Sequence, residues 1–279
     1  MNKTKIEWCD STLNPVVGCM RQCDYCYARK MNNRFKWIPD FSKPQFFPER
    51  LEQLKSKKSN NIFMDSMSDI EYWKDEWIEE IFTACHNAPQ HNYLFLTKNA
   101  EGYENAIENY ACEDRGSQDS FEFFKNFWFG VSITNQNDVH KAVELQKLDE
   151  GHRFLSIEPL HGPIQLNIKK DRCPVCGSNE IYQDNPVTSM GWAEYYCDSC
   201  GEWVSLNKNE LKPSIDWVII GAETGNRKGK VIPLKRWVNG IVRQCKEFDI
   251  PVFMKDSLVP IIGEENMLRE FPDRLRRNR

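Results

Sequence analysis

Six short apolar runs recur along the chain, and each is followed by a polar turn and usually by a stretch with helical periodicity. They cover residues 61–65, 93–97, 127–132, 153–157, 216–221 and 251–255. Because nearly every position in them is apolar, both faces of each predicted strand should be buried, as in a parallel sheet. We expect helices between the strands, at about 71–87, 100–110, 136–148 and 234–247.

Alternating strands and helices predict right-handed βαβ units. A first strand near Pro15–Gly18, ahead of a cysteine-rich loop, would bring the number of repeats to six or seven. The expected fold is therefore α/β, with a partial or complete (β/α) barrel. An open doubly wound sheet is the alternative, and both folds bind ligands at the carboxyl ends of their strands.

Polar residues stand at the carboxyl ends of six predicted strands. They are Asp65, Ser66, Thr97, Lys98, Ser132, Glu158, Glu223 and Lys255. For any single residue, a surface or capping role is an equally good interpretation. Six strand ends with this property are better explained by one shared pocket.

Residues 165–213 interrupt the rhythm of strands and helices and contain few apolar runs. We interpret this segment as an inserted zinc-ribbon-like module. The first part of the barrel would then span residues 1–164, and its last part, with the C-terminal tail, residues 214–279.

Charge is distributed unevenly. The chain has 37 basic and 41 acidic residues, but residues 1–58 carry a net charge of +6 and residues 59–150 one of −12. A protein that coats polyanions generally is therefore not expected, although a local basic patch is possible. No secretory signal and no run of 18 apolar residues is found. We therefore expect no membrane association and a cytoplasmic location, where thiols stay reduced.

Seven of the eleven cysteines fall into two groups, which in a reducing compartment favours metal ligation over disulfides. Cys19, Cys23 and Cys26 have the spacing C-x3-C-x2-C. Three thiolates on one short loop can each bind one iron of a [4Fe–4S] cluster. The fourth iron is then open to a small molecule with adjacent amino and carboxylate groups. The alternative is a closed zinc site that adds Cys9, although C-x9-C exceeds the usual spacing.

The second group consists of two C-x2-C-G motifs, with Cys173, Cys176, Cys197 and Cys200. This pattern is typical of a structural zinc ion bound by four thiolates, and an auxiliary iron–sulfur cluster is the alternative. Its role would be to fold the insertion, and it could also present Trp192 or Trp203 to a partner such as nucleic acid.

The cysteine loop, its place after a first strand and the β/α rhythm resemble the radical S-adenosylmethionine (SAM) superfamily. Within or beside it, the chain is most similar to a phage-associated three-cysteine-motif protein family of unknown function. The segments that carry this resemblance are Lys5–Trp8, Asn14-Pro15, Met64–Asp69, Leu96–Lys98, Gly130–Ile133, Ser156–Leu160, Trp217–Gly225 and Val252–Lys255.

The resemblance implies an enzyme whose [4Fe–4S] cluster, on Cys19, Cys23 and Cys26, cleaves SAM reductively. The resulting 5′-deoxyadenosyl radical would abstract hydrogen from a substrate, and a flavodoxin or ferredoxin would supply electrons. SAM would be bound through its carboxylate by Lys98, its amino group by Asp65 and Ser66, its ribose by Ser132 and Asn135, and its adenine by backbone near Tyr25 and Tyr27. Glu158, Glu223, Lys255 and Arg227 are left for the substrate.

Leu96–Lys98 and Ser132 also show a distant likeness to spore photoproduct lyase, which favours a nucleic acid or nucleotide as substrate. Two alternatives stay open. One is radical modification of a protein or small metabolite. The other is a non-catalytic, metal-stabilised module that binds nucleic acid or protein.

Overall fold

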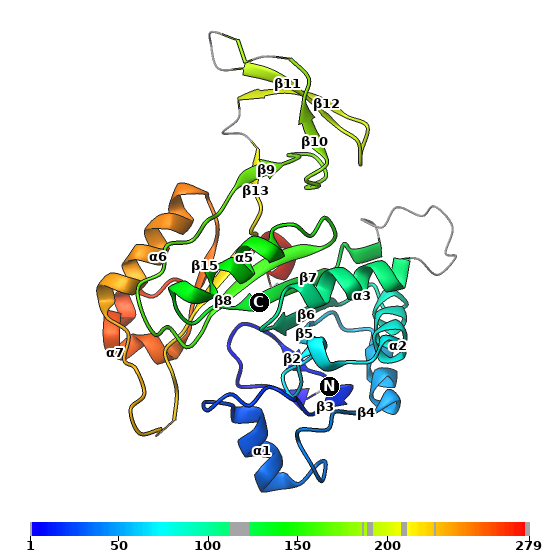
Figure 1. Ribbon diagram of the computed structural model, residues 1–279, viewed down its shortest axis with the longest axis vertical. Coiled ribbons are helices and arrows are strands. Elements are labelled where there is room, and N and C mark those ends of the chain that lie inside the picture. The colour runs from blue at the N-terminus through cyan, green and yellow to red at the C-terminus, as the bar shows by residue number, and fades with distance from the viewer. Residues whose placement is uncertain are drawn as a thin grey trace.

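The computed structural model describes residues 2–111, 123–185, 187–188, 192–207, 211–225 and 227–276. Its main sheet has eight strands in the order β1-β2-β5-β6-β7-β8-β14-β15, and it curls into a half-barrel (Figure 1). All neighbours from β2 to β15 pair in parallel, whereas β1 (Asn2–Lys3) is antiparallel to β2. The seven parallel strands are β2 (Ser11–Thr12), β5 (Asn61–Phe63), β6 (Asn92–Thr97), β7 (Phe127–Ser132), β8 (His152–Ile157), β14 (Trp217–Ile220) and β15 (Val252–Met254).

Helices cover one face of this sheet. Their apolar sides share a single buried cluster with strand residues such as Tyr93, Phe95 and Leu155. The helices that contribute buried residues to this cluster are α2 (Asp75–His86), α3 (Glu101–Ala111), α5 (Val139–Leu145), α6 (Lys235–Glu247) and α7 (Val259–Ile262). Except for the short α7, these helices lie where the sequence predicts them. Short 3-10 turns, including η2 (Ile70–Tyr72) and η3 (Gln136–Asp138), precede α2 and α5.

The opposite, concave face has a separate core. Alternate strand residues form it, because successive side chains in a strand point to opposite faces. Its members are Phe63, Leu94, Trp128, Phe154, Trp217, Ile219 and Phe253, covered by Trp8 and Cys9 from the N-terminal segment and by Leu275. Chain termini rather than helices therefore cover this face. The prediction of a partial barrel is confirmed, and the doubly wound alternative is wrong.

The first strand is not where the sequence predicts it. Val16–Val17 (β3) leaves the main sheet and pairs antiparallel with Gln45–Phe46 (β4). The first parallel strand is instead β2, whose Ser11 and Thr12 pair with Ile62 and Phe63. Val17 is buried in a small cluster beside the cysteine loop, together with Ile38 and Phe41. Val17 is therefore apolar because it is buried in this cluster, not because it belongs to the main sheet.

Between β8 and β14 the chain forms two small sheets that stand away from the half-barrel (Figure 1). The first pairs β9 (Lys170–Arg172) with β13 (Lys212–Pro213). The second is antiparallel and contains β10 (Ile181–Gln183), β11 (Trp192–Cys197) and β12 (Trp203–Asn207). Its buried side holds Ala193, Tyr195 and Leu206.

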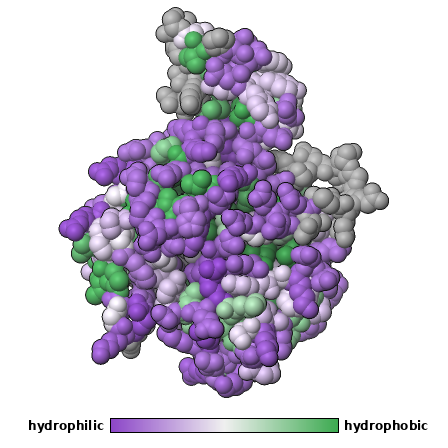
Figure 2. All heavy atoms as spheres, in the orientation of Figure 1, coloured by the Kyte–Doolittle hydropathy of each residue, from purple (hydrophilic) through white to green (hydrophobic). Residues whose placement is uncertain are grey.

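Figure 2 shows that mostly hydrophilic residues cover one face of the molecule, with small hydrophobic patches between them. Among the described residues, no helix is both long and apolar enough to cross a bilayer.

Candidate functional site

Polar side chains gather at the carboxyl ends of the parallel strands. Ser132 is the last residue of β7 and points to the concave side by the alternation of that strand, whereas Lys98, Glu158, Glu223 and Lys255 come just after their strands end. Each of the five lies an even number of residues after a member of the concave core. The separation is four residues for Lys98 after Leu94, Ser132 after Trp128, Glu158 after Phe154 and Glu223 after Ile219, and two for Lys255 after Phe253. These residues therefore share the carboxyl edge of the sheet, and the single pocket expected from them stays a prediction. In three strands a small residue lies between the polar residue and the nearest residue of the concave core: Gly130, Ser156 and Gly221.

Glu158 and Lys255 form an ion pair at this edge. Lys255 Nζ lies 2.5 Å from Glu158 Oε1, although β14 separates their strands. Gly221 makes this possible, because a Cβ atom there would lie 3.0 Å from Glu158 Cδ and 3.1 Å from Lys255 Cδ. The two predicted substrate residues are thus in contact, and both side chains are more than three-quarters buried.

Glu223 is anchored by two cationic or polar partners. Arg227 donates to both carboxylate oxygens, at 2.6 and 2.7 Å, and His161 Nε2 lies 3.5 Å from Oε2. The hydrogen bonds from Arg227 are the main cause that lowers the pKa of Glu223. Glu223 is therefore an ionised group that orients its neighbours rather than a proton donor.

The cysteine loop reaches this edge through Tyr25. The Lys98 Nζ atom lies 5.2 Å from the centre of the Tyr25 ring, and the His161 ring meets Tyr25 edge-on at 6.1 Å. A second link is the ion pair between Arg21 of the loop and Glu71. Lys98 and Tyr25, which were expected to bind opposite ends of one cofactor, thus lie side by side.

Two buried carboxyl groups follow β5. Asp65 accepts hydrogen bonds from the backbone N–H of Leu96 at 3.0 and 3.1 Å, and Asp69 accepts from the Thr97 hydroxyl at 2.6 Å. Burial is the main cause that raises the pKa of both groups, and the charge of Asp69 raises that of Asp65 further. A cationic group placed beside them would stabilise their ionised forms. Asp69 was not singled out from the sequence, although a second carboxylate soon after a buried strand was a usable signal.

Ser66 is held between two elements. Its hydroxyl donates to Asn14 Oδ1 at 3.0 Å, and its carbonyl accepts from the Tyr27 hydroxyl at 2.6 Å. Tyr27 is the first residue of α1 (Tyr27–Phe35), so this bond ties the helix after the cysteine loop to the end of β5. The sequence did not predict that Tyr27 and Asn14 contact Ser66.

The two residues expected near a ribose differ. Ser132 ends β7 and is buried on the concave side. Asn135 instead caps η3, where its Oδ1 accepts from the backbone N–H of Asn137 at 2.9 Å and its Nδ2 donates to Thr134 at 3.0 Å. Its amide is occupied by these local hydrogen bonds.

Cys19, Cys23 and Cys26 are free, half-buried thiols on one loop. Gly18 starts the loop at φ +116°, where a Cβ would lie 2.8 Å from Pro44 Cα, so only glycine fits. Cys26 caps α1 by accepting from the backbone N–H of Arg29 at 3.3 Å. Burial first, and then the charges of Asp69, Cys26 and Cys23, raise the pKa of Cys19 to about 12. Ligation of a cation would be needed to deprotonate it.

The three sulfurs of the cysteine loop do not all lie within 4.8 Å of one another. Within the described part of the chain, one group of at least three His, Cys, Asp or Glu ligand atoms lies mutually within 4.8 Å, and it excludes these three sulfurs. Cys9, the fourth ligand of the zinc alternative, lies in the concave core with its Sγ 3.9 Å from Ile6 O. A cluster that binds each sulfur to a different iron spaces its ligands more widely than one ion does. Of the other dispersed cysteines, Cys85 and Cys245 are buried, and Cys112 lies outside the described residues.

The group whose ligand atoms do lie within 4.8 Å of one another is the second set of cysteines: Cys173, Cys176, Cys197 and Cys200. The Sγ–Sγ distance is 3.9 Å for Cys173 and Cys200 and 3.6 Å for Cys176 and Cys197. Four sulfurs about 2.3 Å from one tetrahedral zinc ion would lie about 3.8 Å apart. These residues therefore form a four-cysteine metal-binding site whose spacing fits a single ion.

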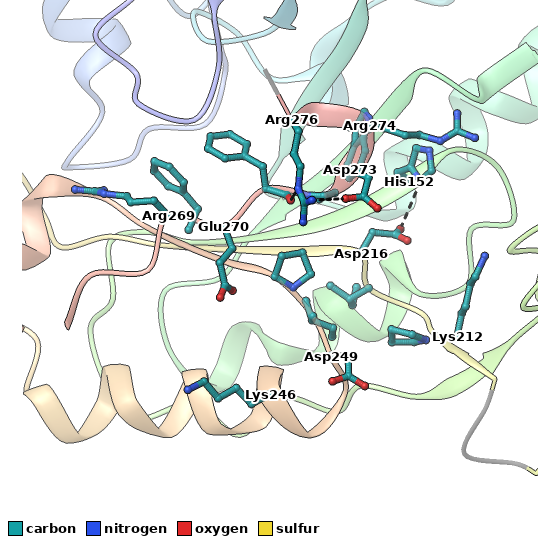
Figure 3. Close-up of a pocket in the computed structure, with 18 of the residues that line it drawn as sticks. His152, Lys212, Asp216, Lys246, Asp249, Arg269, Glu270, Asp273, Arg274 and Arg276 are labelled. Carbon is teal, nitrogen blue, oxygen red and sulfur yellow. Dashed lines mark hydrogen bonds and ion pairs between the residues drawn. The ribbon is translucent and has the colours of Figure 1, made fainter. Parts of the chain in front are cut away.

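A groove of about 1470 Å³ lies at the opposite, amino-terminal end of the strands (Figure 3). The residues that line it include His152, Lys212, Asp216, Lys246 and Arg274. None of the residues predicted from the sequence to bind a cofactor or substrate lies there. We place the candidate site at the carboxyl ends because the cysteine loop and the polar groups of the strand ends meet there.

Comparison with known proteins identifies a family but no activity. Residues 3–259 match DUF5131, which is described as a protein of unknown function. The chain therefore belongs to the DUF5131 family. Neither the curated proteins nor the solved structures include a match.

Proposed function

We propose that this protein is a radical SAM enzyme whose [4Fe–4S] cluster is held by Cys19, Cys23 and Cys26. The observation that carries this proposal is the contact between Tyr25 of the cysteine loop and Lys98 at the end of β6. It brings a loop with three free thiols to the carboxyl edge of a half-barrel, where the polar side chains of further strand ends also lie.

The cluster, with SAM bound, would supply a strong one-electron reduction that breaks a carbon–sulfur bond. The chain's own residues bind and orient the cofactor. Lys98 neutralises a carboxylate, while the buried Asp65 and Asp69 favour an ammonium group beside them. The aromatic core below the polar edge excludes water from the reacting centre.

Glu158, Lys255 and Glu223 would face the substrate. The Glu158–Lys255 pair offers one acceptor and one donor within 2.5 Å, and it can open to pair with polar groups of a substrate. Glu223 holds Arg227 at the edge, where a guanidinium can bind a phosphate or carboxylate.

A nucleic acid or nucleotide is the substrate class that the surroundings of the loop favour. Four large apolar side chains on and after α1 are unusually exposed: Tyr27, Met31, Phe35 and Trp37, at 52%, 38%, 50% and 44%. The Phe35 and Trp37 rings stack with 5.4 Å between centres, and Arg34 lies over Phe35. Residues 27–37 carry four basic and no acidic residues. Aromatic faces among positive charges suit bases and phosphates of single strands.

Metal analysis tests the cluster. After anaerobic reconstitution, we expect iron and sulfide that Cys23→Ala loses, and zinc that it keeps. The matched variant Cys197→Ala should lose zinc and keep iron. Zinc in both wild-type sites, with no iron, would refute the proposal. Electrons from a flavodoxin or ferredoxin should reduce the cluster.

Binding to an oligonucleotide at low salt tests the substrate class, since phosphate contacts are strongest there. Trp37→Ala and Arg34→Ala should each weaken binding of oligothymidylate, whereas Ile232→Ala, at an exposed site on another segment, should not. If the wild-type protein cleaves SAM but binds no oligonucleotide, the substrate is a protein or small molecule. If it binds oligonucleotides but holds no iron, the alternative of a non-catalytic binding module is preferred.

A further inference from the structure

The three-stranded sheet of the four-cysteine module has an aromatic outer face. Tyr182 of β10, Tyr196 of β11 and Trp203 of β12 are direct cross-strand neighbours in one row. Tyr182 is 56% and Trp203 57% exposed, and the Tyr196 and Trp203 rings lie 5.0 Å apart. Trp192, 43% exposed, lies on the same face four residues before Tyr196.

The exposed aromatic side chains are not part of the core of the module. Ala193, Tyr195 and Leu206 alternate with the outer residues and form a buried cluster on the other face. The four cysteine sulfurs provide a second internal constraint. An aromatic row left outside both is typical of a binding surface.

Two acidic residues lie beside the row. Glu194 lies between Trp192 and Tyr196 on the exposed side of β11. Asp184 stands beside it, because its backbone N–H donates to the Glu194 carbonyl at 2.8 Å. Across residues 173–207 there are five acidic residues, Glu180, Asp184, Glu194, Asp198 and Glu202, and no basic residue.

We propose that this face binds a basic protein segment, with lysine or arginine side chains over the aromatic row and paired with Glu194 and Asp184. Cations lie favourably over the faces of Trp and Tyr, and carboxylates add charge-assisted hydrogen bonds. A nucleic acid would stack on the same rings, but five negative charges without a positive one would repel its phosphates. This binding is independent of the function proposed for the cysteine loop.

Fluorescence anisotropy with the full-length, metal-loaded protein tests this inference. The probe is a labelled dodecapeptide in which lysine and arginine alternate with serine. A peptide with glutamate at the basic positions and oligothymidylate serve as comparison ligands. We expect the basic peptide to bind, with an affinity that falls as salt rises.

Trp203→Ala and Glu194→Lys should each weaken binding of the basic peptide about tenfold, since loss of a cation–π contact or an ion pair is worth about 1–2 kcal/mol. Glu264→Lys, an exposed site on the half-barrel with the same change of charge, is the matched control and should bind as the wild type does. Retained zinc in each variant shows that the module is folded.

Equal peptide binding by wild type and both module variants would overturn the proposal, as would no binding by the wild type. Oligothymidylate binding that Trp203→Ala removes would show that the face serves nucleic acid instead.

Discussion

The Lys98 ammonium group lies 5.2 Å from the centre of the Tyr25 ring, which connects the end of β6 to the cysteine loop. In the radical SAM proposal, Lys98 pairs with the cofactor carboxylate, a charge-assisted contact worth about 1.5–3 kcal/mol. Lys98→Ala should therefore raise the Kd for SAM about tenfold to a hundredfold, measured by calorimetry on cluster-loaded protein.

Lys98→Arg keeps the charge and should recover part of this affinity. Tyr25→Phe keeps the ring beneath the cation and should bind SAM nearly as the wild type does. If Lys98→Ala binds SAM normally while iron content is unchanged, Lys98 has no role in holding the carboxylate.

Gly130 lies where Phe154 of the neighbouring strand packs on the concave face. A Cβ at position 130 would be 2.2 Å from the Phe154 ring. Gly130→Ala should therefore destabilise the fold by about 1–3 kcal/mol, the usual cost of overpacking, in urea unfolding. Gly240→Ala, in α6 with open space around its Cβ, should be neutral or stabilising by up to about 1 kcal/mol.

The double variant Gly130→Ala with Phe154→Leu checks the mechanism, because the smaller side chain relieves the clash. We expect the two changes together to cost less than the sum of the single costs. Simple additivity would mean that the ring does not cause the loss.

His152 gives stability a pH dependence. It stacks on Trp128 with 4.3 Å between ring centres, and burial, aided by Arg153 and Arg274, lowers its pKa to about 4 against the opposing effect of Asp216. Between this pKa and the unfolded value of about 6.5, the unfolded chain binds more protons than the native one. Stability from His152 is therefore complete above about pH 6.5 and is lost as pH falls towards 4, by at most about 3 kcal/mol.

His152→Phe keeps the stack and removes the titration. Urea midpoints at pH 7.5 and pH 5 should differ less in this variant than in the wild type. An identical pH dependence of the two proteins would show that His152 is not buried as a neutral ring.

Metal removal should affect the two cysteine groups separately. Cys197→Ser leaves three ligands in the four-cysteine site and should release the metal ion that we expect there, which would supply much of the folding energy of such a small module. We expect the near-UV signal from the module's Trp and Tyr residues to collapse, while iron content and SAM binding persist. Loss of iron in the same variant would mean that the half-barrel depends on the module.

Much of the fold could be predicted from the sequence because buried parallel strands leave continuous apolar runs. Phe127–Ser132 is predicted at its observed bounds, and the other five runs lie within two residues of theirs. The first strand could not be found in this way. Ser11 and Thr12 are polar, and it is their pairing with β1 and β5 that makes them part of the sheet.

For the candidate site, position at a strand end located the residues in the sequence. The sequence did not show which of them pair in space. Strand ends identify Glu158 and Lys255, but their ion pair lies over Gly221 of the strand between them, which the sequence did not show. Asn135 follows a strand as the others do, yet it caps a turn, because its amide bonds the backbone N–H of Asn137 and the Thr134 hydroxyl. Spacing in the sequence separated the two cysteine groups, and the structure adds that the four-cysteine group brings its sulfurs within 4.8 Å of one another.

Cleavage of SAM tests the central proposal most directly. Cluster-loaded protein, incubated anaerobically with SAM and dithionite, should release 5′-deoxyadenosine and methionine. Cys23→Ala should release neither, whereas Cys197→Ala should retain the activity. Wild-type protein with a full complement of iron and no 5′-deoxyadenosine above the level of Cys23→Ala would contradict the proposed function.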